Sequence, residues 1–268
     1  MANASPILTT TAQSMLLEDY LRQLRLPTFV KSHAKFAEDA AKTNQPYDHF
    51  LLALTEQEIA QRERNRQTQR IKSARFPVLK ELADFDFSAL PSLNKPLVLQ
   101  LARGEYLSKR ESIVLIGNPG LGKTHLATSL ALAACRQAHK VRFFNVATLV
   151  NELIVAQDKH QIERYIAAAL KHRLIVLDEL GFVPLTPNGA QLMFQFCSAL
   201  YERVCFIITT NLRFADWTQV FLNEQLTAAL LDRLTHRAHI VEFTGESFRF
   251  KQRLKHQSKQ TQDKEVSC

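Results

Sequence analysis

The chain has 268 residues, 46% of them hydrophobic, which is enough apolar material for one large domain or for a large and a small one. Its formal charge of +8 favours a polyanionic partner, although charge alone gives only non-specific attraction. The four cysteines lack paired spacing, no apolar run reaches the length of a membrane span, and no basic residue precedes Arg22, so we expect a cytoplasmic protein with no membrane contact rather than a secreted or membrane protein.

Residues 1–60 are predicted to form a small all-helical domain. The first ten residues are small and polar, so we expect them to fray. Apolar residues recur at helical spacing from Gln13 until Pro27 interrupts the pattern, and again in the stretches 29–36 and 50–54. Three short helices are therefore expected before residue 60.

A long basic helix is predicted next. Thr55 and Glu58 form a capping-box pattern, which indicates that the helix begins there, and Ile59 and Ile71 are its large apolar residues. Such a composition fits a solvated connector or a phosphate-contacting element, and the overall charge favours nucleic acid. The candidate DNA-binding residues are Arg62, Arg64, Arg66, Arg70, Lys72 and Arg75. The Phe-Pro pair at 76–77 ends the helix, so we interpret residues 61–80 as a basic helix or linker.

From residue 81 to residue 268, short apolar runs rich in β-formers alternate with helical patterns. The runs are 113–116, 141–146, 174–177, 204–209 and 239–243. This alternation predicts an α/β domain in which helices cover both faces of a parallel five-stranded sheet. Ligands of such sheets bind at the carboxyl ends of the strands, so functional residues are expected there.

A phosphate-binding loop follows the first predicted strand. Residues 117–124 read GNPGLGKT and match the pattern G-x-x-x-x-G-K-[ST] at every required position. In such a loop the backbone N–H groups surround a di- or triphosphate, Lys123 reaches the β- and γ-phosphate oxygens, and the Thr124 hydroxyl ligates Mg²⁺. The predicted nucleotide-binding residues are Gly117, Asn118, Pro119, Gly120, Leu121, Gly122, Lys123, Thr124 and His125.

Polar residues end the third and fourth predicted strands. Asp178 is predicted to hold Mg²⁺, and Glu179 to orient and deprotonate an attacking water, which favours ATP hydrolysis over phosphoryl transfer to a small molecule. A solvent-facing acid pair is the structural alternative, which the upstream phosphate loop disfavours. Asn211, with Thr210 as second choice, is predicted to sense the γ-phosphate, although a turn-forming asparagine is ordinary after a strand.

Two arginines lie near the end of a predicted helix at 226–237. Leucines occupy one face of this helix and leave Arg233 and Arg237 near its end. Such arginines either complete the active site of a neighbouring subunit or stabilise the carboxyl end of the helix through its dipole, and the residues alone leave both readings open. The nine histidines lack metal-ligand spacing.

Several segments together resemble one family. GNPGLGKTHLA, LIVLDELGFVPL, IITTNLRFADW, LLDRLTHRAHIVEF and GESFR, in this order, resemble the IstB family of transposition helper ATPases, which belong to the AAA+ class and are related to DnaC-type helicase loaders. LRQLRLPTFVKSH and IKSARFPVLKEL extend the resemblance over nearly the whole chain. It implies an AAA+ P-loop NTPase fold without a long C-terminal lid, consistent with the short stretch after Phe243.

The resemblance also implies a function. Such a protein would hydrolyse ATP with Mg²⁺, bind duplex DNA without strong sequence preference, form an ATP-promoted homo-oligomer on it, and help an insertion-sequence transposase to capture target DNA. It would be cytoplasmic in a bacterium and associated with the nucleoid when bound to DNA. A DnaC-type loader of a replicative helicase is the alternative, which the amino-terminal resemblance disfavours. A nucleotide kinase is a third possibility, which Glu179 and the lack of an evident acceptor pocket disfavour.

The resemblance assigns roles by motif. Lys123 and Thr124 would hold phosphate and Mg²⁺, and Asp178 and Glu179 would form the Walker B element. Asn211 falls at sensor 1. Arg233 is the first choice for an arginine finger and Arg237 the second. Phe248 stands where the family commonly has tyrosine, and Arg249 is expected near the nucleotide.

Overall fold

The computed structural model describes residues 10–245 and residue 247. It forms two compact units, Met1–Thr68 and Gln69–Cys268, which we call the helical unit and the α/β unit. Three of the expectations above concern residues outside the described ones: the frayed first residues, Phe248, and Arg249 with the basic tail. Among the described residues, no helix combines the length and the apolar character needed to cross a lipid bilayer.

The helical unit contains α1 (Thr10–Gln23), α2 (Pro27–Lys42) and the larger part of α3 (Tyr47–Ala74). Pro27 occupies the first turn of α2, where its fixed φ suits the helix and its missing N–H is not needed. The predicted helix start at Thr55 is wrong, because α3 already begins at Tyr47 and the Thr55 hydroxyl donates to Leu51 O at 2.7 Å inside the helix. The expected third short helix and the basic helix are therefore one element.

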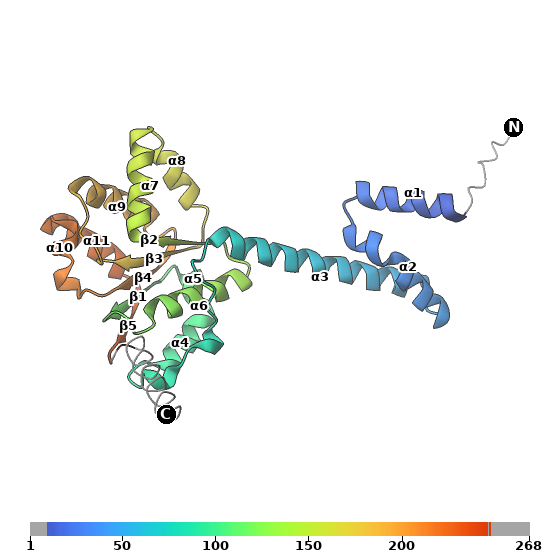
Figure 1. The fold of residues 1–268 in the computed structure, drawn as a ribbon, viewed down its shortest axis with the longest axis horizontal. Helices are drawn as coiled ribbons and strands as arrows, with labels where there is room; N and C mark the ends of the chain where they lie inside the picture. The colour runs from blue at the N-terminus through green and yellow to red at the C-terminus, as the bar shows by residue number, and fades with distance from the viewer. Residues whose placement is uncertain (1–9, 246, 248–268) are drawn as a thin grey trace, which may run out of the picture. The chain divides into compact units, whose positions relative to one another are not determined.

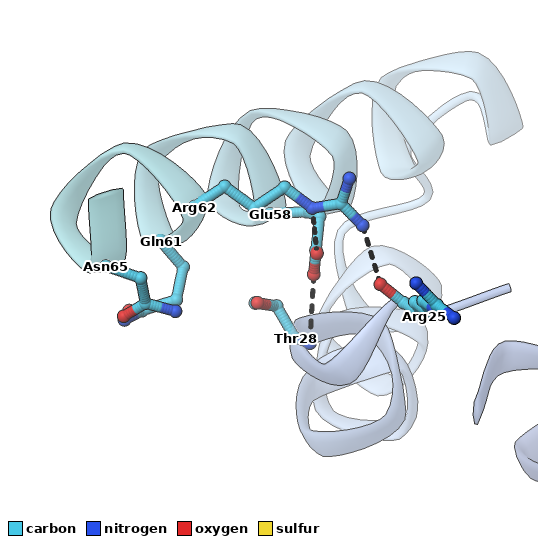
Figure 2. A network of polar contacts seen from close by, with 6 residues as sticks. All are labelled: Arg25, Thr28, Glu58, Gln61, Arg62 and Asn65. Carbon is cyan, nitrogen blue, oxygen red and sulfur yellow. Dashed lines mark hydrogen bonds and ion pairs between the residues drawn. The ribbon is translucent and has the colours of Figure 1, made fainter. Parts of the chain in front are cut away.

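Glu58 joins two helices of the helical unit instead of closing a capping box. Its carboxylate is 4% exposed and accepts from Thr28 N at 2.9 Å, at the start of α2 where Leu26 gives no side-chain cap. Arg62 donates from Nε to Glu58 at 2.7 Å and from Nη2 to Arg25 O at 2.6 Å (Figure 2). Burial raises the pKa of Glu58, but these hydrogen bonds outweigh it and hold the pKa below its usual value. Glu58 thus caps α2 from a distance.

The α/β unit is built on a five-stranded parallel sheet. Its strands are β1 (Ser112–Gly117), β2 (Val141–Asn145), β3 (Leu174–Leu180), β4 (Cys205–Thr210) and β5 (Ala238–Phe243), in the order β2-β3-β4-β1-β5. Leu115 of β1 is in register with Thr209 on one side and Val241 on the other. The structure confirms the predicted parallel sheet.

Helices cover both faces of this sheet (Figure 1). One face carries α4 (Lys95–Ala102), α5 (Glu105–Lys109) and α6 (Lys123–Arg136); the other carries α7 (Val146–Asp158), α8 (Ile162–Ala169), α9 (Pro187–Leu200), α10 (Thr218–Phe221) and α11 (Glu224–Thr235). Short 3₁₀ turns are η1 (Leu82–Asp84), η2 (Phe87–Ala89) and η3 (Phe214–Asp216). Side chains of β3 alternate between the two cores, Leu174 and Val176 towards α6, Ile175 and Leu177 towards α9. Two buried faces explain why the strands are continuously apolar.

The end of α3, from Gln69 to Ala74, belongs to the α/β unit and packs within it. Ala74 is fully buried, and Arg70 donates from Nε to Cys135 O at 3.1 Å, at the carboxyl end of α6. Arg142 of β2 donates to Ser73 O at 3.3 Å. Cys135, Cys197 and Cys205 are buried free thiols. The end of α3 is therefore fixed by polar contacts to backbone carbonyls as well as by burial.

Candidate functional site

The phosphate-binding loop connects β1 to α6 and requires glycine. Gly117 has φ 148°, and a Cβ there would lie 2.2 Å from Phe243 O. Gly122 has φ 89° and precedes the first turn of α6. The Lys123 ammonium, 9% exposed, donates to Gly117 O at 2.6 Å and to Asn118 O at 2.8 Å. The loop thus holds a buried cation beside the amino end of a helix, which is an arrangement that binds anions.

A cavity of about 530 Å³ lies over this loop. Of the residues predicted from the sequence, the structure places Pro119, Gly120, Leu121, Gly122, Lys123, Thr124, His125, Glu179 and Asn211 in its lining. The stretch 77–90, to which sequence reasoning gave no role, also lines the cavity, with Pro77, Val78, Phe85 and Leu90 as apolar groups. The Phe-Asp-Phe run at 85–87 in that stretch was the available signal.

Asp178 lies at the carboxyl end of β3 and is 5% exposed. Its Oδ1 accepts hydrogen bonds from Thr124 Oγ1 at 2.9 Å and from Thr209 Oγ1 at 2.6 Å. Burial raises the pKa of Asp178, and the two hydroxyl hydrogen bonds offset part of this effect. A buried carboxylate beside a threonine hydroxyl offers the oxygen ligands that Mg²⁺ prefers, so this pair fits the metal.

An irregularity in β3 directs Glu179 away from the core. The register between β3 and β4 shifts between Leu177 and Leu180, and Glu179 takes a left-handed φ of 63°. Its backbone N–H donates to Thr209 Oγ1 at 2.8 Å. A strand bulge of this kind re-aims a side chain, and here the Glu179 side chain faces the cavity. The Thr209 hydroxyl therefore positions both acids, because it donates to the Asp178 carboxylate and accepts from the Glu179 backbone N–H.

Asn145 is a polar neighbour of the site that sequence reasoning missed. It ends β2 in register with Asp178, and its Nδ2 donates to Glu179 Oε2 at 2.9 Å. Its Oδ1 accepts from Ala147 N at 3.1 Å and so caps α7. The available signal was a polar residue within the predicted strand 141–146, next to the acids in a parallel sheet.

Thr210 and Asn211 line the cavity at the end of β4. Thr210 is in register with Ile116, the residue before the phosphate loop begins. The Thr210 hydroxyl accepts from Leu212 N at 3.1 Å and is thereby occupied within its own turn. Asn211 follows Thr210 in the lining, and its contact with the γ-phosphate stays a prediction.

Arg233 and Arg237 lie at the opposite edge of the sheet. Arg237 precedes β5, and its carbonyl accepts from Ser112 N at 2.7 Å, where β1 begins. The Arg233 guanidinium donates to Ala229 O at 2.8 Å and lies 5.0 Å from the centre of the Phe194 ring. Within one chain, the structure does not bring these arginines to the phosphate loop, which follows the carboxyl end of β1.

The six candidate DNA-binding residues differ in their surroundings. Arg62 and Arg70 donate to backbone carbonyls as described above, although Arg62 is also 44% exposed. The other four, Arg64, Arg66, Lys72 and Arg75, are exposed as well. Arg64 donates to Gln61 Oε1 at 2.8 Å, and Arg66 pairs loosely with Glu63 at 3.8 Å. A basic composition alone could not separate these two groups.

Known proteins resemble this chain in sequence and in fold. The family described as IstB-like ATP binding protein matches residues 19–256. The protein named for ATP binding in insertion sequence IS5376 of Geobacillus stearothermophilus is 32% identical over 244 residues, 91% of this chain and 97% of its own length. Its counterpart in insertion sequence IS21 of Pseudomonas aeruginosa is 34% identical over 239 residues, 89% of this chain and 90% of its own length.

A solved structure of DnaI is similar to this chain in fold. The similar region covers 62% of this chain and 91% of the DnaI chain, with a TM-score of 0.50 and 18% sequence identity. Together with the parallel sheet and the phosphate loop, it confirms the predicted AAA+ P-loop NTPase fold. The family description supports ATP as a ligand of this chain. The chain therefore belongs to the IstB-like ATP binding protein family.

Proposed function

We propose that this protein is a Mg²⁺-dependent ATPase that assembles on duplex DNA in its ATP-bound state and helps an insertion-sequence transposase to capture target DNA. The observation that carries the proposal is that Lys123, Thr124 and Glu179 line one cavity, and that Thr124 donates a hydrogen bond to the buried Asp178. The relatives that are named for insertion sequences support the link to transposition.

Each residue of the cavity has a chemical role in this proposal. Lys123 and the backbone N–H groups of the loop neutralise the phosphates, and Asn211 contacts the γ-phosphate. Thr124 and Asp178 would hold Mg²⁺, which neutralises charge that develops on the phosphate oxygens. Glu179 takes a proton from the water that attacks the γ-phosphorus, the bond to the β–γ bridging oxygen breaks, and ADP and phosphate leave.

The position of the two arginines supports a homo-oligomer. Arg233 and Arg237 lie at the far edge of the sheet from the phosphate loop of their own chain, so a role in hydrolysis requires a second subunit. Arg233 remains our first choice for this role and Arg237 the second. Large exposed apolar side chains on the helical unit, such as Met15, Tyr20 and Leu24, support further protein contacts.

Charge and exposure support DNA binding. The chain carries a net charge of +8, and Arg64, Arg66, Lys72 and Arg75 are exposed on α3. In this proposal residues 1–60 and the basic stretch 61–80 contact DNA or other subunits, and residues 81–268 hydrolyse ATP. The protein acts in the bacterial cytoplasm, on the nucleoid when it is bound to DNA.

The mass of the protein on duplex DNA tests the proposal. We expect a large DNA-bound assembly with a slowly hydrolysed ATP analogue, and none with ADP or without nucleotide. Lys123→Ala should lose nucleotide binding and assembly, whereas Glu179→Gln should bind ATP and remain assembled in ATP itself. Equal assembly by both variants, or a monomer under all conditions, would contradict the proposal.

A further inference from the structure

One wall of the nucleotide cavity is a strap of chain, residues 77–90, that contributes no strand to the sheet. Its regular structure consists of the 3₁₀ turns η1 and η2. The strap residues that line the cavity are Pro77, Val78, Lys80, Asp84, Phe85, Asp86, Ala89 and Leu90. Because the loop before α6 also lines this cavity, the shape of the cavity depends on how the strap is held against that helix.

Glu81 fastens the strap to α6 at two places. Its carboxylate accepts from Arg136 Nη2 at 2.5 Å and from Arg136 Nη1 at 3.2 Å, in the last turn of the helix. Its backbone carbonyl accepts from His125 Nε2 at 3.0 Å, in the first turn. A bidentate contact between a guanidinium and a carboxylate restricts the relative orientation of the two groups as well as the distance between them.

Phe85 carries this attachment to the phosphate loop. Its ring is 8% exposed and meets the His125 ring edge-on, with centroids 5.3 Å apart. A Cβ at Gly122 would lie 3.2 Å from Phe85 Cε2, so the ring already touches the loop. A movement of the strap would therefore displace Gly122 and His125, which belong to the predicted phosphate-binding segment.

We infer that Glu81, acting through Arg136 and His125, positions the strap against α6 and so sets the affinity of the pocket for ATP. This inference rests on the proposed function, because it takes the cavity as the ATP site. Glu81 and Arg136 do not line the cavity, so they act through the strap. Glu81 is a positioning residue, and its removal should change ATP affinity without changing the hydrolytic step.

The test is direct titration of ATP with Mg²⁺ into the full-length protein, together with steady-state hydrolysis in the presence of DNA. We expect Glu81→Ala and Arg136→Ala each to raise the Kd and KM for ATP about two- to fivefold, the range that a partly exposed ion pair can supply, with kcat unchanged. His125→Ala should act in the same direction, and alanine suits the helix at that position.

Two control variants separate the effect of the Glu81–Arg136 pair from other effects of substitution. The exchange Glu81→Arg with Arg136→Glu should restore the Kd to within about twofold of the wild type, since it rebuilds the pair. Arg164→Ala removes an exposed arginine from α8, on the other face of the sheet, and should leave the Kd unchanged. Single variants that bind ATP like the wild type, or an exchange no better than either single variant, would overturn the inference while the proposed function stands. A wild-type protein that binds no ATP would overturn both.

Discussion

Burial and metal binding place opposite requirements on the charge of Asp178. The fold buries this carboxylate, which destabilises its charged form and raises its pKa, whereas metal binding requires that charge. Thr124 and Thr209 compensate for part of the cost by donating hydrogen bonds to the same oxygen. If Asp178 holds Mg²⁺ as we propose, it contributes function at the expense of stability.

Asp178→Asn should separate these two effects. The amide oxygen still accepts from the threonines, but no charge is buried, so without Mg²⁺ we expect this variant to melt above the wild type at pH 7 and to have lost hydrolysis. Since the folded pKa lies above the unfolded value of 3.8, the penalty is absent below pH 3.8 and grows as pH rises through the folded pKa. Melting curves from pH 4 to 7 should diverge; a variant less stable throughout would contradict this.

Asn145 has two separable contacts, one to Glu179 and one to the start of α7. Serine caps a helix as well as asparagine does but is too short for Glu179, so Asn145→Ser should keep the melting temperature. Because the hydrogen bond from the Asn145 amide restrains the Glu179 carboxylate, we expect kcat without DNA to rise about two- to tenfold with KM unchanged. Asn145→Ala should also lower the melting temperature by about 2 to 4 °C, since it loses the cap.

Hydrolysis assays and melting curves of the two variants side by side check this prediction. If Asn145→Ser leaves kcat unchanged, the hydrogen bond from Asn145 does not restrain Glu179. If kcat falls instead, Asn145 orients the carboxylate for reaction rather than holding it back.

At the scale of elements, the helical unit depends on a buried acid. Glu58→Ala removes both the distant cap of α2 and the partner of Arg62, and should destabilise the unit by about 2 kcal/mol. Hydrogen exchange of the α2 amides in the intact protein should accelerate about 30-fold, while the strands of the α/β unit stay protected. Glu56→Ala, at an exposed position two residues earlier, is the matched control and should exchange like the wild type.

The same contact predicts a pH dependence. The pKa of Glu58 is lowered on folding from 4.5, so its stabilisation is fully present above pH 4.5 and is lost as pH falls through the folded pKa. Protection of α2 should therefore decline in acid, and Glu58→Gln should weaken that decline. An equal acid response in the two proteins would show that other carboxylates control the unit.

Helix α3 combines two kinds of arginine. Arg64 and Arg66 are exposed, so if α3 contacts DNA, alanine at either should weaken binding about equally for all sequences and reduce the slope of log K against log salt by about 1. Arg62 and Arg70 bind backbone carbonyls of the protein itself, so alanine there should lower stability more than it changes the slope. Equal slopes in Arg64→Ala, Arg66→Ala and the wild type would argue against α3 as a DNA contact.

At the scale of the whole molecule, the site is incomplete if Arg233 acts on a neighbour. Arg233→Ala should bind ATP normally and lose about 10³-fold or more of its hydrolysis on DNA. Glu179→Gln should be inactive for a different reason. Mixing the two inactive proteins on DNA should regenerate hydrolysis, because some interfaces then pair an intact Glu179 with an intact Arg233. A mixture as inactive as its components would exclude this role, and the same experiment with Arg237→Ala tests the second choice.

The sequence by itself determined the features that local chemistry encodes. The glycines and Lys123 of the phosphate loop have few alternatives, since their spacing is dictated by one turn of backbone around a phosphate. Continuously apolar runs indicated strands buried on both faces, and the parallel order of the sheet confirms them. Asp178 and Glu179 were found because a strand end delivers them to the edge where ligands bind.

Only the tertiary structure decided which residues from distant parts of the chain meet. Glu58 has the sequence spacing of a capping box, but it caps α2, which begins about thirty residues earlier. Arg62 and Arg70 belong to a basic stretch that is typical of a DNA contact, but they donate to backbone carbonyls of their own chain. Asn145 of β2 donates to Glu179 of β3, and Glu81 of the strap accepts from Arg136 of α6. A hydrogen bond between residues far apart in sequence leaves no periodic pattern, so its partner is fixed by packing alone.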